Sequence, residues 1–198
     1  MIDFGQVRRK EETWHELVDE LGITRESLGP LTGEVRSKLL EVIVDLDDAD
    51  VTCVPLDPDT NDPSWTLCHV IVRATAYAEE AAPQGLTLAR GIDVREPSCY
   101  EVPWESATTA EFIEDRLQES RRIRLAMLTA RPDRPHLNIF HVSAPGQPGR
   151  NAIARFASGI YHDDGHVDHI RKIAAQAKAG REGSRQSDRG RPTMARCP

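Results

Sequence analysis

The stretch SWTLCHVIVRATAYAEEAA, Ser64 to Ala82, restricts the possible folds more than any other part of the chain. Its apolar residues surround nearly the whole circumference of a helix, and such a helix is stable only when neighbouring elements cover it on several sides. Ser64 is a typical N-cap residue, and Pro83 and Gly85 predict the helix end. The fold must therefore place this helix inside a set of packed partners.

Helical spacing of apolar residues predicts those partners elsewhere in the chain. A segment after Pro30 has Thr32 as its expected N-cap, and Thr108 or Thr109 opens another. The expected helices besides 64–82 span residues 11–21, 32–46, 108–128 and 151–179. Proline-rich connections separate them, and the chain has neither alternating strands and helices nor a glycine-rich phosphate loop. These features predict an all-α fold, a four-helix bundle with long crossover loops.

The 198 residues favour one folded domain with additions at its ends. We expect an N-terminal helical extension over 1–29, the bundle over 30–178 and a disordered basic tail over 179–198. The tail prediction rests on REGSRQSDRGRPTMARCP, which offers almost nothing to bury. A leading helix over 11–21 would end at Gly22.

Charge and cysteine content exclude several classes of protein. The formal charge of −7 disfavours nucleic acid as a partner. Four cysteines lack the CxxC spacing of a zinc finger, and Cys68 and Cys99 are expected to be small core residues rather than reactive thiols. No signal peptide opens the chain, and no window reaches the roughly 18 apolar residues of a membrane span. We therefore expect a cytoplasmic protein without a membrane partner.

Three of the seven histidines fall between residues 162 and 169. At about 100° per residue, one stripe of the last helix carries Asn151, Arg155, Ser158, His162, His166 and His169. The stripe borders the apolar face, so it should look inward, where clustered imidazoles are costly unless they are satisfied. A divalent metal ion would satisfy them. His162 and His166 at i and i+4 suit two ligands, and His69 on the apolar helix is the expected third, leaving one open coordination position.

Each candidate also has a structural interpretation. His69 could be a hydrogen-bonded core residue. His169 is expected to face substrate as an acid or base, although by spacing it could replace His162 or complete the metal site. Asn151 and Arg155 would suit an anionic substrate, yet Asn151 could simply cap the helix and Arg155 could pair with a carboxylate on another helix. Asp163 and Asp164 are expected to be solvated.

The segments SWTLCHVIVRA and NAIARFASGIYHDDGHVDHIRKI resemble those of the DinB/YfiT-like superfamily of metalloenzymes. The resemblance covers roughly residues 30–178. It implies a four-helix bundle with a three-histidine site for Zn, Ni or Fe at His69, His162 and His166, and it places His169 where many relatives have Gln or His. Characterised relatives include transferases and isomerases that use thiols such as bacillithiol or mycothiol.

The resemblance implies a metal-dependent thiol S-transferase, or a related enzyme, that acts on a small substrate and, as family members often do, pairs as a homodimer. A metal-dependent hydrolase and a non-catalytic binding or stress-response protein stabilised by metal remain alternatives. HDDGH also resembles the HExxH motif of zinc proteases and the His-Asp pair of HD phosphohydrolases. The expected rotation of Asp163 away from the stripe disfavours the protease motif. The phosphohydrolases need more helix and another Asp after the pair, whereas here the predicted tail soon follows.

Overall fold

The computed structural model describes residues 16, 18–19, 22–55, 65–94, 101–142 and 148–189. Its helices are α3 (Arg25–Ile43), α4 (Asp48–Thr52), α5 (Leu67–Ala89), the 3-10 helix η1 (Trp104–Ser106), α6 (Ala110–Thr129) and α7 (Ala152–Arg189). The described part of the chain contains no strand, and an isolated β-bridge joins His141 to Arg150. The prediction of an all-α fold is therefore confirmed.

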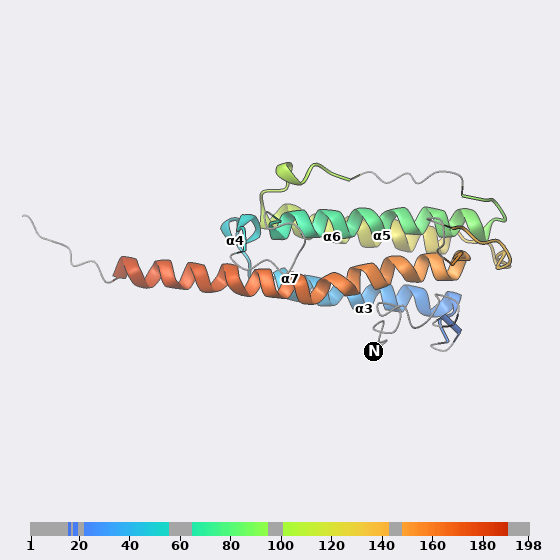
Figure 1. Cartoon of the computed structure of the whole chain (residues 1–198), viewed down its shortest axis with the longest axis horizontal. Helices are drawn as coiled ribbons and strands as arrows, with labels where there is room; N and C mark the ends of the chain where they lie inside the picture. Colours follow the sequence, from blue (N-terminus) through green and yellow to red (C-terminus); the bar gives the residue numbers. More distant parts are fainter. Residues whose placement is uncertain are drawn as a thin grey trace, which may run out of the picture.

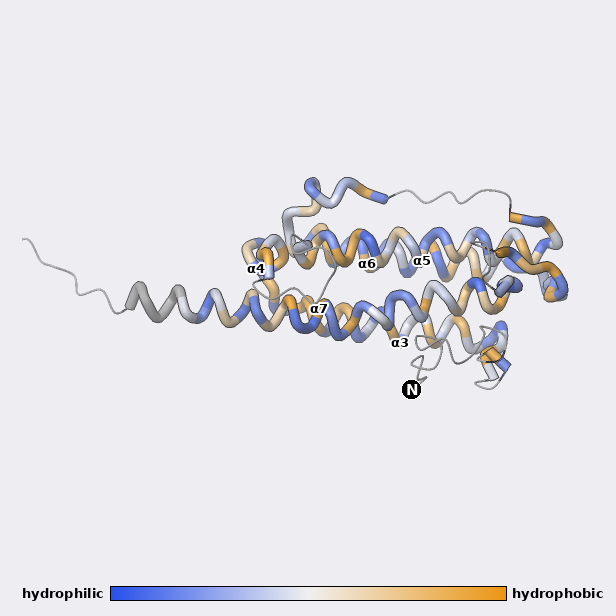
Figure 2. Tube along the Cα trace, viewed as in Figure 1, coloured by the Kyte–Doolittle hydropathy of each residue, from blue (hydrophilic) through white to orange (hydrophobic). Residues whose placement is uncertain are grey.

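The four long helices lie side by side, and the C-terminal part of α7 extends beyond the other three (Figure 1). Helix α5 packs against α6 and α7, and α3 packs against the same two helices. Apolar and polar residues alternate along each long helix (Figure 2), as expected for helices that bury one face. One core cluster takes a buried residue from each of the four: Leu39, Ile71, Leu117 and Ile170. The predicted burial of α5 is confirmed.

Helix α3 begins earlier than the sequence predicted. Thr24 is its N-cap, and the Ser27 hydroxyl accepts a hydrogen bond from the Thr24 backbone N–H at 2.9 Å. Pro30 lies inside the helix, and Thr32, the expected cap, is buried with its hydroxyl donating to the Leu28 carbonyl. The predicted domain boundary between residues 29 and 30 is therefore wrong. Local capping at Thr24 and the burial of Leu28 outweigh the one backbone hydrogen bond that proline removes.

Helix α5 continues through the two residues that were expected to end it. Pro83 and Gly85 both lie inside the helix, which ends before Gly91, a residue with φ of 83°. A Cβ atom on Gly85 would stand 2.5 Å from the Phe156 ring, so this glycine admits a close side-chain contact rather than a turn. The N-cap is Thr66, whose hydroxyl accepts the His69 N–H at 3.2 Å. The expected cap Ser64 lies outside the described residues.

Helix α7 also runs past its expected end. It passes through Gly180 to Arg189, so the prediction of a disordered tail is wrong for residues 179–189; residues 190–198 lie outside the described part. The Arg181 guanidinium pairs with Asp47 and Asp50 at 2.8 and 2.7 Å, and this contact joins α7 to α4. Arg181 in the predicted tail thus pairs with carboxylates of a segment far away in sequence, and composition alone does not predict this contact.

The remaining boundaries follow the predictions more closely. Thr109 is the N-cap of α6, and its hydroxyl accepts the Phe112 N–H at 3.1 Å. Residues 130–142 and 148–150 contain no helix, as their prolines predicted. Of the expected helix over 11–21, residues 16, 18 and 19 are described and helical, and the chain then turns at Gly22 with φ of 57°.

Candidate functional site

Where α5 packs against α7, the polar side chains of Tyr77 and Gln84 on α5 form a second polar stripe that faces the stripe of α7. The Tyr77 ring stacks on the His162 ring with centroids 4.2 Å apart, and the Arg155 Nε donates to the Gln84 Oε1 at 2.5 Å. Residue numbers rise along α5 as they fall along α7, so the two helices run antiparallel. The predicted inward direction of the α7 stripe is confirmed at these two positions.

The histidines of α7 lie close together on this stripe. Ring centroids of His162 and His166 are 4.7 Å apart, and those of His166 and His169 are 6.2 Å apart. All three side chains are partly buried. The Nδ1 atom of His162 is buried and has no hydrogen-bond partner in the described structure. A buried ring nitrogen without a hydrogen-bond partner is a feature that a metal ion or a polar atom of a ligand would satisfy.

His69 has a different environment. Its ring is stacked between the indoles of Trp65 and Trp104, with centroid distances of 4.3 and 4.7 Å. Tyr77, which contacts His162, lies eight residues further along α5, a separation of about 12 Å along a helix axis. The structure therefore brings His162 and His166 together and places His69 about two helix turns from the level of His162. No group of three His, Cys, Asp or Glu side chains within the described ranges is arranged to hold a metal ion.

The two expected substrate contacts separate in the structure. Asn151 caps α7: its Oδ1 accepts the Ala154 N–H at 3.1 Å, and its Nδ2 donates to the Leu137 carbonyl. Arg155 is 3% exposed, and its guanidinium donates to three uncharged oxygens, those of Gln84, Tyr77 and Ser158. Asn151 thus caps the helix, which was the structural alternative to binding substrate. For Arg155, the structural alternative was an ion pair with a carboxylate of another helix, and the described residues contain no such partner.

Two guanidinium groups act on the Tyr77 hydroxyl. Burial raises the pKa of Tyr77, but the positive charges of Arg155 and Arg150 and their hydrogen bonds outweigh it, so the pKa lies below its usual value. Arg155 Nη1 and Arg150 Nη1 donate to this oxygen at 3.2 and 3.3 Å. The end of the stripe beyond His162 is therefore electropositive.

The structure corrects the prediction for Asp163, the residue that follows His162. Asp163 is 1% exposed, and its Oδ2 accepts from Arg36 of α3 at 2.9 Å and from Arg124 of α6 at 2.5 Å. The prediction that Asp163 is solvated is wrong. A signal was present: Asp163 continues the apolar spacing of Phe156, Ile160, Val167 and Ile170, so it occupies a core position of α7.

A second ion pair lies in the same interior. Arg116 of α6 and Glu79 of α5 are 2.7 Å apart. With Arg36, Arg124 and Asp163 they make three cations against two anions, a net charge of one positive unit between the helices. Desolvation lowers the pKa of Arg36, while Asp163 opposes that shift. Asp164 is partly buried and binds Lys38 at 3.3 Å, so its predicted solvation is also only partial.

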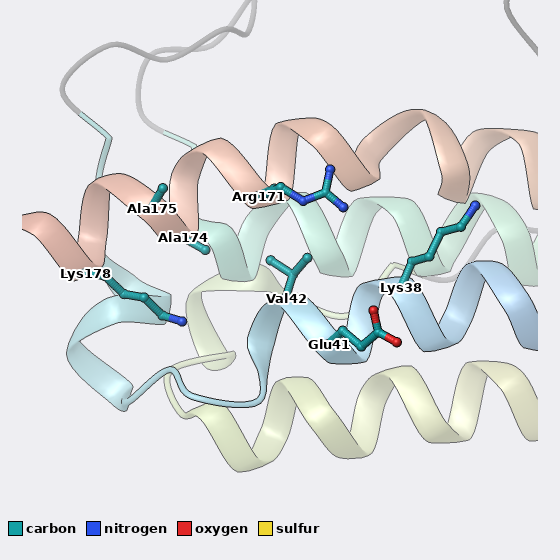
Figure 3. Close-up of a pocket in the computed structure, with 7 residues that line it drawn as sticks. All are labelled: Lys38, Glu41, Val42, Arg171, Ala174, Ala175 and Lys178. Atoms are coloured by element: carbon teal, nitrogen blue, oxygen red, sulfur yellow. The ribbon is translucent and has the colours of Figure 1, made fainter.

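A cavity of about 310 Å³ opens between α3 and α7 (Figure 3). Its lining is Lys38, Glu41, Val42, Arg171, Ala174, Ala175 and Lys178. None of the predicted site residues lines it. Lys38 pairs with Glu34 and Asp164, and Arg171 pairs with Asp168, so these cations are already neutralised by neighbouring carboxylates. We therefore centre the candidate site on the α5–α7 stripes.

Comparison of the chain with protein-family models, curated proteins and solved structures gives no match. None of the helices in the described ranges combines the length and apolar character needed to cross a membrane. Cys68 is buried, as expected, and burial raises its pKa to about 11. This thiol is therefore protonated at neutral pH and is no nucleophile.

Acidification is expected to destabilise the metal-free protein in part through His162. Burial, the largest cause, lowers the pKa of His162, with Arg73 and Arg124 contributing and Asp163 opposing. The unfolded chain then binds the proton more readily, so stability present above about pH 6.5 is lost as the pH falls. Urea unfolding in chelator at pH 7.5 and pH 5 measures the effect. His162→Phe should lose less stability between these pH values than wild type; an equal loss would contradict the prediction.

Proposed function

We propose that this chain is a DinB-like four-helix bundle that binds one divalent metal ion, Zn, Ni or Fe, through His69, His162 and His166. The observation that carries the proposal is the His162–His166 pair, set one turn apart on α7 with ring centroids 4.7 Å apart. The buried Nδ1 of His162 supports it, because a metal would occupy a lone pair that otherwise stays unsatisfied.

The third ligand decides how well these residues fit a metal. The His69 ring is stacked between two indoles, and within the described ranges it forms no three-ligand group with the pair. His169 is the alternative, since its ring centroid is 6.2 Å from that of His166 on the same stripe. Three histidines and an open position form the donor set of a catalytic rather than a closed structural site. If His69 is the ligand, His169 keeps its proposed acid or base role.

The proposed reaction is transfer of a low-molecular-weight thiol to a small electrophilic or anionic substrate. A bound metal would supply a Lewis acid that lowers the pKa of the thiol. The proposed thiol is a cosubstrate; Cys68 is buried, and burial raises its pKa to about 11, so it does not take this role. Tyr77 stacks on His162 and orients its ring. Cys53 and Cys68 are free thiols, in agreement with the reducing cytoplasm that we propose as the protein's compartment. A homodimer remains part of the proposal.

Metal content tests the proposal directly. Purified protein incubated with Zn or Ni and then desalted should retain about one equivalent by elemental analysis, whereas His162→Ala and His166→Ala should lose at least ten-fold in metal affinity. Comparing His69→Ala with His169→Ala identifies the third ligand, because only the variant that removes a ligand weakens binding. His136→Ala, on an exposed side chain outside the stripe, is the control.

Absence of bound metal in the wild-type protein after loading would overturn the proposal. Metal retained without any thiol consumption, in the presence of a small electrophile such as monobromobimane, would instead favour the non-catalytic metal-stabilised protein. The loaded enzyme is expected to consume the thiol faster than the chelator-treated protein.

A further inference from the structure

The guanidinium of Arg155 is a buried charge without a countercharge among the described residues. Its Nε and Nη1 donate to the oxygens of Gln84, Tyr77 and Ser158, which are all neutral. No Asp or Glu of the described chain lies within ion-pair distance of it, and its Nη2 donates to no described residue. Burying an unpaired cation is costly, so this arrangement favours an anion that the chain itself does not provide.

Three other arginines between the helices each contact a carboxylate. Arg36 and Arg124 share Asp163, and Arg116 pairs with Glu79. Arg131 donates to the Leu128 carbonyl at the end of α6, where the negative end of the helix dipole favours a cation. No carboxylate of the described chain pairs with Arg155, whose guanidinium carbon lies 5.4 Å from the centre of the Tyr77 ring.

The position of Arg155 on α7 adds to the positive potential around its guanidinium. Arg155 is the fourth residue of this helix, whose first turn carries no acidic residue, and the amino end of a helix is the positive end of its dipole. The Glu80 carboxylate does not contact Arg155 directly. It accepts from the Gln84 Nε2 at 2.8 Å, and Gln84 lies between the two charges. The electropositive region is therefore not neutralised by direct contact.

A second guanidinium converges on the same point. Arg150 Nη1 donates to the Tyr77 hydroxyl at 3.3 Å, and Arg155 Nη1 donates to that oxygen at 3.2 Å. Arg150 and Tyr77 are each partly exposed, whereas Arg155 is buried. Arg155 and Arg150 therefore bring two positive charges to one uncharged oxygen.

We propose that Arg150, Arg155 and Tyr77 bind the carboxylate group of a small-molecule ligand at the amino end of α7. A carboxylate suits the cluster because its two oxygens can accept separately from two guanidiniums and its single charge offsets part of theirs. The inference extends the proposed function: the Tyr77 ring stacks on His162, so a ligand held here would present its remaining atoms to the histidine cluster.

Acetate is the probe for this subsite. The metal-free full-length protein is titrated with sodium acetate at constant ionic strength, and the arginine Nε–H signals are followed by NMR. Wild type should show a saturable shift that includes the Arg155 signal. Arg155→Lys and the partly exposed Arg150→Gln should each weaken the affinity at least ten-fold, with folding of both checked by circular dichroism. Arg171→Gln, on the same helix and paired with Asp168, should bind acetate like wild type.

Three results would overturn the inference: no saturable shift in wild type, unchanged affinity in both Arg150→Gln and Arg155→Lys, or saturation by inorganic phosphate without any by acetate. The test is separate from that of the metal. Loss of acetate binding with one equivalent of metal retained defeats only the carboxylate subsite. Acetate binding by a protein that takes up no metal supports the subsite and defeats only the metal proposal.

Discussion

Replacing Asp163 by alanine is expected to lower the free energy of unfolding by about 3–5 kcal/mol, the cost of removing one partner from a buried ion pair. The substitution leaves Arg36 and Arg124, each nearly fully buried, without the carboxylate that both contact. The interior already carries more positive than negative charge, and its other carboxylate, Glu79, is paired with Arg116. Urea unfolding of the two proteins at pH 7.5 measures the difference.

Asp164→Ala is the matched control for this prediction. Asp164 is the adjacent residue of α7, and its ion pair with Lys38 is partly exposed on both sides. Exposed and half-exposed pairs contribute about 0–1 kcal/mol, so this variant should lie close to wild type. Equal losses in the two variants would mean that the Asp163 network is not a buried ion pair of the kind described.

Replacing Gly159 by leucine is expected to lower the free energy of unfolding by about 3 kcal/mol, at the upper end of overpacking costs. A Cβ atom on Gly159 would stand 3.0 Å from the Ala81 Cβ and 3.4 Å from the Ala78 backbone. Backbone atoms of α5 cannot rotate away as a long side chain can, so the larger side chain forces α5 and α7 apart. The Tyr77–His162 contact one turn away should weaken with them.

Gly180→Leu is the control on the same helix. No heavy atom lies within 4 Å of a Cβ placed on Gly180, so leucine fits there and improves the helix propensity by roughly 0.5–1 kcal/mol. The two glycine substitutions are therefore expected to change stability in opposite directions. A Gly159→Leu protein as stable as Gly180→Leu would show that α5 and α7 do not approach as closely as described.

Several features of the site followed from local sequence patterns. The apolar circumference of α5 and the Thr109 cap of α6 are properties of neighbouring residues, and the structure confirms both. The grouping of His162 with His166 is likewise a consequence of helical period, because residues four apart face the same side of any helix. Patterns of this kind depend on one helix at a time, and they determined which face of α7 turns inward.

Contacts between helices decided the rest. Asp163 is buried because Arg36 and Arg124, far away in the chain, supply its hydrogen bonds, and Gly85 sits inside a helix because Phe156 occupies the space beside it. Likewise, His69 stacks between two indoles instead of meeting His162 because the register of α5 on α7 places Tyr77 there. Periodicity determined the all-α class and the histidine stripe, whereas only the tertiary structure determined register, buried pairing and ring neighbours, since these depend on residues that are distant in sequence.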